Sequence, residues 1–174
     1  LEGEFRFDAE FDAVDYSDYL SEKKRFLSKS YTSPVFLYTH NRYPGHSQNS
    51  GECRPNETEL YLEKIKIANK EMKDDVKNVM RANPNSIIVI AGDHGPYLTK
   101  NCERLRDYYD DSEIDKYDVQ DRYGVFLAIR WPEDVDIEKL DIQILQDVFP
   151  AVMVYLYDND EILNAKVKRE TAGS

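Results

Sequence analysis

The sequence predicts an α/β fold with a partial, mostly parallel sheet and flanking helices. Three short apolar runs, within residues 33–39, 86–96 and 123–132, have the length of strands that are buried on both faces. Helical patterns separate these runs, and strands that alternate with helices are typical of a parallel sheet. The chain of 174 residues is long enough for a single domain with its own core.

The first part of the chain predicts one helix and one strand. Residues 4–14 alternate loosely between apolar and acidic side chains, which indicates a short edge strand or an extended arm. A helix is expected over residues 16–30, and Ser17 or Asp18 can cap it. The apolar run at residues 33–39 follows as a buried strand.

The middle of the chain predicts a polar loop and a long helix. Residues 40–55 are polar and rich in hydrogen-bond donors, which suits a binding loop. A helix is expected over residues 56–83, with Asn56 as its N-cap and Pro84 as its boundary. Residues 56–58, Asn-Glu-Thr, also match the acceptor sequence for N-linked glycosylation, but capping explains them without a sugar.

The last part predicts an acidic excursion, a strand and a helix. Residues 97–122 are acidic and rich in tyrosine, and we interpret them as a solvated excursion over the surface, in the manner of a lid. A buried strand is expected over residues 123–132. A helix over residues 141–157 follows, where Pro150 predicts a kink or a break, and the tail from Glu161 predicts a short edge strand.

The charge of the chain argues against one class of partner. The net charge is −11 at pH 7 and the pI is about 4.8, so a basic face for binding a nucleic-acid backbone is not expected. The negative net charge does not exclude small anionic substrates, because a bound cation reverses the local electric field in a pocket. The sequence contains no apolar run near the roughly 20 residues that span a bilayer.

The histidines are the strongest chemical signal in the sequence. The chain has three, His40, His46 and His94, and each follows the end of a predicted buried strand. Because the carboxyl ends of parallel strands meet at one edge of a sheet, we expect these imidazoles to converge there with Asp93. Neutral imidazoles and a carboxylate suit Zn, Mn or Fe, and a carboxylate-rich set suits Mg or Ca. For each of these four residues taken alone, the alternative is a structural role, for example in a turn.

Two arginines and two cysteines lie in the same loops. Arginines such as Arg42 and Arg54 usually face solvent. In a binding loop, however, either can hold an anionic group through two hydrogen bonds. Cys53 and Cys102 are too far apart in sequence for a C-x-x-C metal or redox motif. Their spacing leaves two alternatives open, a disulfide in an oxidising compartment or two free thiols.

The order of these segments resembles that of a known enzyme family. Residues 87–95, Ile-Ile-Val-Ile-Ala-Gly-Asp-His-Gly, are the most specific match. They lie between a histidine loop at residues 35–46, followed by a long helix, and a later strand at residues 123–132, and residues 145–152 resemble a closing Asp-x-x-Pro-Thr helix. Together these segments are similar to the sulfatase-like branch of the alkaline phosphatase superfamily, which includes membrane-anchored phosphoglycerol and phosphoethanolamine transferases.

The resemblance implies a metal-dependent hydrolase or transferase that acts on phosphate or sulfate esters. Asp93 and His94 would be ligands of a divalent metal, which could be Mn, Mg, Ca or Zn. His40 or His46 would contact a phosphate or sulfate oxygen or protonate the leaving group. The resemblance also implies an extracytoplasmic location, periplasmic, extracellular or in the secretory lumen, in a parent protein anchored to a membrane.

The resemblance further implies that part of the site lies elsewhere. The family's first acidic ligand and its nucleophile are not recognisable in residues 1–32, so we expect the chain to be the C-terminal half of a larger catalytic domain. It would need the remainder of that domain, N-terminal to it, and would hydrolyse nothing alone. A bridge between Cys53 and Cys102 would then tie the substrate loop to the loop after His94. The alternative is a non-catalytic α/β binding or regulatory module, in which Asp93 and His94 form only a turn.

Overall fold

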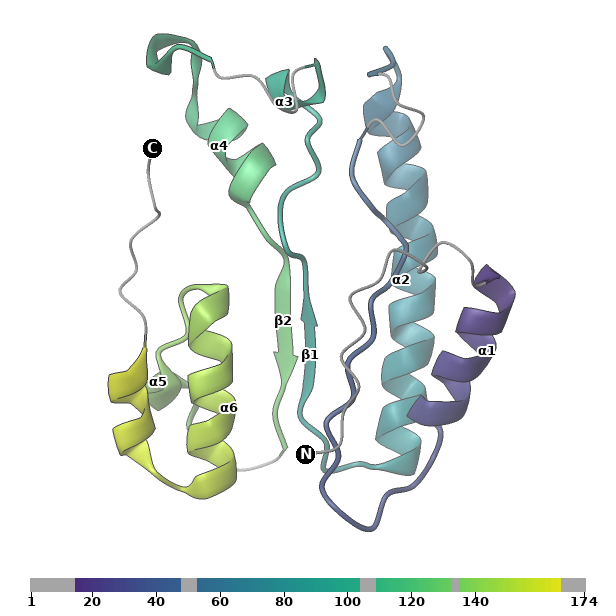
Figure 1. Ribbon diagram of the computed structural model, residues 1–174, viewed down its shortest axis with the longest axis vertical. Helices are drawn as coiled ribbons and strands as arrows, with labels where there is room; N and C mark the ends of the chain where they lie inside the picture. The colour runs from purple at the N-terminus through teal and green to yellow at the C-terminus, as the bar shows by residue number, and fades with distance from the viewer. Residues whose placement is uncertain (1–14, 48–52, 104–108, 133–134, 167–174) are drawn as a thin grey trace.

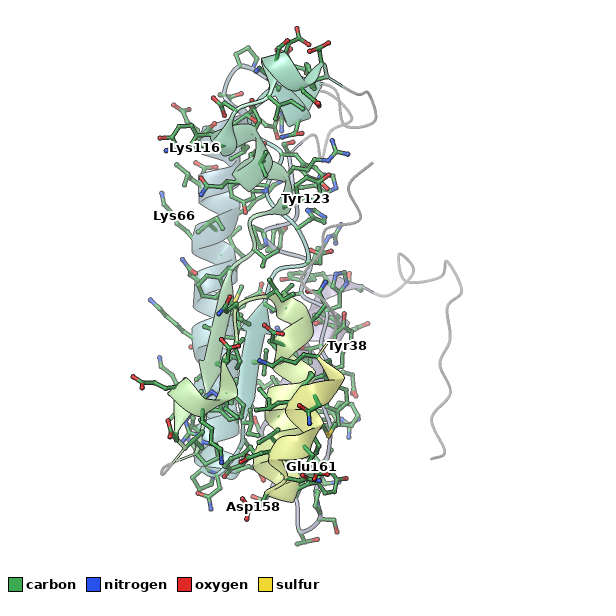
Figure 2. All side chains as sticks on the ribbon, turned by 90° about the vertical axis from the view of Figure 1, so that its left-hand side faces the viewer. Tyr38, Lys66, Lys116, Tyr123, Asp158 and Glu161 are labelled. Atoms are coloured by element: carbon green, nitrogen blue, oxygen red, sulfur yellow. A yellow bond between two sulfur atoms is a disulfide. The ribbon has the colours of Figure 1, made fainter. Side chains whose placement is uncertain are left out.

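The computed structural model describes residues 15–47, 53–103, 109–132 and 135–166, which form an elongated molecule (Figures 1 and 2). The long helix α2 (Glu57–Ala82) runs along one side, and α4 (Lys116–Tyr123) lies at one end of the molecule. The remaining elements are, in chain order, α1 (Tyr16–Leu27), β1 (Ile88–Ala91), α3 (Lys100–Glu103), the 3₁₀ helix η2 (Asp111–Glu113), β2 (Leu127–Arg130), α5 (Ile137–Leu140), η3 (Leu145–Asp147), α6 (Val148–Tyr157) and η4 (Asp160–Ala165).

The sheet in the described part of the chain has two antiparallel strands, so the predicted α/β fold with a mostly parallel sheet is wrong. Ile88 of β1 pairs with Arg130 of β2, and beyond β1 the Gly92 N–H donates to the Phe126 carbonyl at 2.9 Å. The chain leaves β1, passes through α3 and α4, and returns in the opposite direction (Figure 1). A parallel pair needs a connection that crosses back over the sheet, and α3 and α4 only reverse the chain.

The predicted buried strand at residues 33–39 is extended but belongs to no strand of this sheet. Its aromatic side chains lie at the surface, where Phe36 is 75% exposed and Tyr38 is 78% exposed. The Phe36 ring meets that of Phe149 on α6 at a centroid distance of 6.2 Å. The prediction of burial is therefore wrong, because apolar side chains become buried only where another element covers them.

The two long helices form where their sequence patterns predict them. The Asp15 carboxylate caps α1 by accepting the Ser17 N–H at 2.7 Å, so the cap lies just before the two residues that were predicted. The helix α2 covers most of the predicted range 56–83. Asn56 occupies its N-cap position, yet its side chain makes no capping hydrogen bond.

Lys23 joins α1 to α2 in a buried ion pair. Its Nζ lies 2.8 Å from Asp75 Oδ2 and 3.7 Å from Glu71 Oε2, and the Lys23 side chain is 3% exposed. The Tyr16 hydroxyl donates to Glu71 beside this pair, and burial together with this hydrogen bond raises the pKa of Tyr16. Lys23 Nζ also donates to Asn41 Oδ1 at 2.9 Å, which attaches the start of the histidine loop to both helices.

The main apolar cluster lies at the opposite end of the molecule from α4 (Figure 1). Its buried members are Leu140, Ala151 and Val154. The helix α6 starts at Val148, so Pro150 falls in its first turn, where a helix does not use the N–H that proline lacks. At the described start of the tail, the 3₁₀ helix η4 forms in place of the predicted edge strand. Residues 167–174 and the predicted edge strand or arm at residues 4–14 lie outside the described residues. No helix in the described ranges is both long and apolar enough to cross a membrane.

Candidate functional site

Two of the three histidines meet beside the end of β1. His46 comes from the loop before α2 and His94 from the loop after β1, and their ring centroids are 5.7 Å apart. Ser47 holds the two loops together, because its N–H donates to the Pro96 carbonyl at 2.8 Å and its hydroxyl donates to the Tyr97 carbonyl. Ser47 is fully buried. The structure therefore brings together two histidines that are 48 positions apart in the sequence.

Both imidazoles have one nitrogen held by a backbone carbonyl. His46 Nδ1 lies 2.6 Å from the Ser47 carbonyl oxygen, and His94 Nδ1 lies 2.7 Å from that of Gly95. A carbonyl oxygen only accepts hydrogen bonds, so in the neutral ring Nδ1 carries the proton. The lone pair then lies on Nε2 in both histidines. Metal-binding histidines commonly use this arrangement, in which a carbonyl orients the ring through the nitrogen that is not the ligand.

Asp93 adds a carboxylate next to His94. Its Oδ1 accepts the His94 N–H at 3.1 Å, and its Oδ2 lies 3.7 Å from His94 Nε2. The Asp93 side chain is 83% exposed, so it is accessible to an ion or a substrate. Within the described ranges, no group of three or more His, Cys, Asp or Glu side chains is close enough to hold a metal ion.

Tyr97 completes a cluster of three rings that sequence reasoning missed. Its ring stacks on His94 at a centroid distance of 4.7 Å with 7° between the planes, and it lies 5.6 Å from His46. Tyr97 has a φ of 58°, in the left-handed region that non-glycine residues rarely adopt. A single tyrosine after Gly-Pro produces no periodic pattern, so its contact with the histidines has no sequence signal.

Asp121 on α4 anchors the loop that follows His94. Its carboxylate accepts the N–H groups of Leu98 and Thr99 at 2.8 and 3.0 Å, and the Asn101 side-chain amide at 3.1 Å. The backbone of Gly95 packs so close to α4 that a Cβ there would lie 2.0 Å from the Asp121 carbonyl oxygen. Only glycine fits this contact, which explains the second glycine of the Gly-Asp-His-Gly sequence.

Part of the acidic excursion is thus buried, although its charge pattern predicts a solvated face. Asp121 and Asp118 are both 9% exposed. The Asp115 N–H donates to Asp118 at 3.1 Å, and this bond lowers the pKa of Asp118. The two aspartates were missed because an acid that supports a loop cannot be distinguished in sequence from an acid on the surface.

The other predicted site residues have their contacts elsewhere. His40 is exposed, and its carbonyl accepts the Tyr19 hydroxyl of α1 at 2.8 Å. The Arg42 guanidinium lies 5.8 Å from the centre of the Tyr16 ring. Arg54 Nε lies 3.4 Å from Glu57 Oε2 at the start of α2.

An arginine that was not predicted lies nearer to the ring cluster. The guanidinium carbon of Arg122 is 5.9 Å from the centre of the Tyr97 ring, and its Nη1 donates to Asn101 Oδ1 at 3.4 Å. Its backbone carbonyl accepts the Gly95 N–H at 3.0 Å. Arg122 thus places a positive charge beside the ring that stacks on His94.

Cys53 and Cys102 form a disulfide, as the family resemblance implied. Their Cα atoms are 5.5 Å apart, and Cys102 is fully buried. The bond joins the chain just before α2 to α3, which follows the loop of His94 and Tyr97. It is a second connection, besides Ser47, between the two loops that carry the paired histidines.

No protein-family model, curated protein or solved structure matches this chain. We therefore infer function from the geometry of His46, Asp93, His94 and the residues that support them.

Proposed function

We propose that the chain is the C-terminal part of the catalytic domain of a metal-dependent hydrolase or transferase that acts on phosphate or sulfate esters outside the cytoplasm. The observation that carries the proposal is the pairing of His46 with His94, next to Asp93, with the Nδ1 of both rings held by carbonyl oxygens. The proposal does not depend on a parallel sheet, because the loops alone bring these residues together.

Asp93 and His94 would hold the divalent metal, Mn, Mg, Ca or Zn. An exposed carboxylate and an imidazole with its lone pair on Nε2 are suitable donors for such an ion. When bound, the metal would polarise the ester and neutralise charge on its oxygens. Four to six ligands are usual, so in this proposal the remainder of the catalytic domain, N-terminal to the chain, supplies the others together with the nucleophile.

His46 would act on the substrate itself. The lone pair on its Nε2 can accept a proton, and the protonated ring can donate one to the leaving oxygen of the ester. His46 is preferred over His40 for this role because His46 lies beside His94. Arg122 adds positive charge near Tyr97, which favours an anionic ester in a chain whose net charge is −11.

The exposed apolar segment at residues 33–39 supports the proposal of a larger domain. Phe36 and Tyr38 are mostly exposed there. Phe36 lies beside Phe149 of α6, which is 59% exposed, at a ring centroid distance of 6.2 Å. Neighbouring exposed apolar side chains such as these commonly mark an interaction site. We assign this surface to contact with the remainder of the catalytic domain.

Titration with Mn²⁺ tests the metal site directly. The chain has three histidines, so imidazole NMR signals report on His40, His46 and His94 separately. Substoichiometric Mn²⁺ is expected to broaden the ring signals of His46 and His94 more than those of His40. Asp93→Asn should reduce this broadening, whereas Asp111→Asn, a change of another exposed aspartate, should not.

The outcome separates the enzyme from its alternative. If the Asp93→Asn chain shows the same broadening as the unchanged chain, Asp93 is not a metal ligand, and a non-catalytic binding or regulatory module becomes the better description. In the full-length polypeptide, His46→Gln is expected to lower the hydrolysis of p-nitrophenyl phosphate or sulfate by about 10²- to 10⁴-fold, with little effect of His40→Gln.

A further inference from the structure

Asn56 lies at the start of α2 in the only Asn-x-Ser/Thr sequence of the chain, Asn56-Glu57-Thr58. Capping would explain an asparagine at this position without any modification. The structure removes that explanation, because the Asn56 side chain makes no capping hydrogen bond. We infer that Asn56 is a site of N-linked glycosylation. This inference does not rest on the proposed ester chemistry.

The start of α2 is held by neighbouring groups instead of the Asn56 side chain. Glu57 Oε2 accepts the Arg54 N–H at 3.2 Å, and the Glu57 N–H donates to the Arg54 carbonyl at 3.0 Å. The Asn56 carbonyl accepts the Leu60 N–H at 3.1 Å, so only its backbone is part of the helix. A glycan on the side-chain amide would therefore leave these hydrogen bonds intact.

The side chains that a glycosylating enzyme must reach are at the surface. Asn56 and Thr58 are both exposed, and so is Pro55 before them. Glu57 is 4% exposed. It is the middle position of the acceptor sequence, where any residue except proline is accepted. The folded chain can thus carry a large polar group here, as glycosylated asparagines require.

The disulfide indicates the compartment in which this modification takes place. Cys53, three positions before Asn56, is bonded to Cys102. Disulfides of this kind form and persist in oxidising compartments such as the secretory lumen. Lipid-linked oligosaccharides are used in the same compartment, so the disulfide and the acceptor sequence are two independent features that agree.

The reaction is a simple group transfer. The donor is an oligosaccharide linked through a pyrophosphate to a lipid. A bond forms between Asn56 Nδ2 and the first sugar carbon, and the bond from that carbon to the pyrophosphate oxygen breaks. Nδ2 loses one proton, and the lipid pyrophosphate leaves with the electron pair of the broken bond.

The test uses the protein purified from the organism that makes it. Treatment with peptide-N-glycosidase should increase its gel mobility and convert Asn56 to aspartate, as read by peptide mass spectrometry. In the same host, Asn56→Gln and Thr58→Ala should abolish the mobility shift, whereas Thr58→Ser should retain it. The side-chain amide of Asn56 makes no capping hydrogen bond, so Asn56→Gln should also fold normally. An unmodified Asn56 in the native protein, or a shift that persists in Asn56→Gln, would overturn the inference.

Discussion

Ser47 makes the contacts through which the histidine loop is positioned. It follows His46 directly, and both its N–H and its hydroxyl donate to carbonyls of the Pro96–Tyr97 segment. Because His46 Nδ1 bonds to the Ser47 carbonyl, the serine also orients the imidazole. A residue that touches neither a metal nor a substrate can therefore determine how His46 faces His94.

We predict that Ser47→Ala separates the two rings. The change removes the hydrogen bond from the Ser47 hydroxyl to the Tyr97 carbonyl, which should lower the free energy of unfolding by about 1 kcal/mol. Nuclear Overhauser contacts between the His46 and His94 rings should weaken. Ser21→Ala is the matched control, because the Ser21 hydroxyl donates to the Ser17 carbonyl on the exposed surface of α1. Equal effects of the two changes on the ring contacts would contradict the positioning role.

At the scale of elements, a buried ion pair attaches α1 to α2. Lys23 is buried against two carboxylates, whereas Arg25, two residues further along the helix, pairs with Glu22 in solvent. The cost of removing one partner depends on burial, since a buried charge left alone cannot regain water.

Lys23→Met should accordingly destabilise the chain by about 3 kcal/mol, because Asp75 and Glu71 lose their counter-ion. Arg25→Met removes a cation of the same helix and should destabilise the chain far less than Lys23→Met does, since exposed pairs contribute little. Urea unfolding of both variants measures the difference. Similar losses in the two variants would mean that the Lys23 pair is no stronger than a surface pair.

The elements also show where sequence patterns are reliable. The range of α2 follows from its amphipathic pattern and from the proline after it, both of which are local. The positions of β1 and β2 within two apolar runs were also predicted. Their antiparallel direction was not, because a run of apolar residues carries no information about the direction of its partner. Residues 33–39 show the same limit, since apolar side chains predict burial only if a covering element exists.

For the whole molecule, the Cys53–Cys102 disulfide joins segments that lie 49 residues apart. It closes a loop that contains all of α2 and β1 together with His94. A covalent link across such a loop stabilises mainly by limiting the unfolded chain. It also keeps the two histidine loops near each other when the noncovalent contacts open.

Replacing both cysteines by serine should lower the free energy of unfolding by about 4 kcal/mol, the value expected for a loop of this length. Dithiothreitol should destabilise the unchanged chain by a similar amount and leave the double variant unaffected. Thermal unfolding with and without the reductant measures both effects. If the double variant is as stable as the unchanged chain, the disulfide does not stabilise the fold by restricting the unfolded chain.

The sequence by itself determined the local features of this protein: the extent of the long helix, the positions of two strands, and the presence of Asp93 and His94 at the end of one of them. Each of these features is determined by residues that lie only a few positions away in the sequence. Only the tertiary structure decided that His46 faces His94, that Tyr97 and Asp121 support the pair, that Cys53 bonds to Cys102, and that the strands are antiparallel. Each of these is a contact between distant segments, and its free energy depends on how the intervening chain folds.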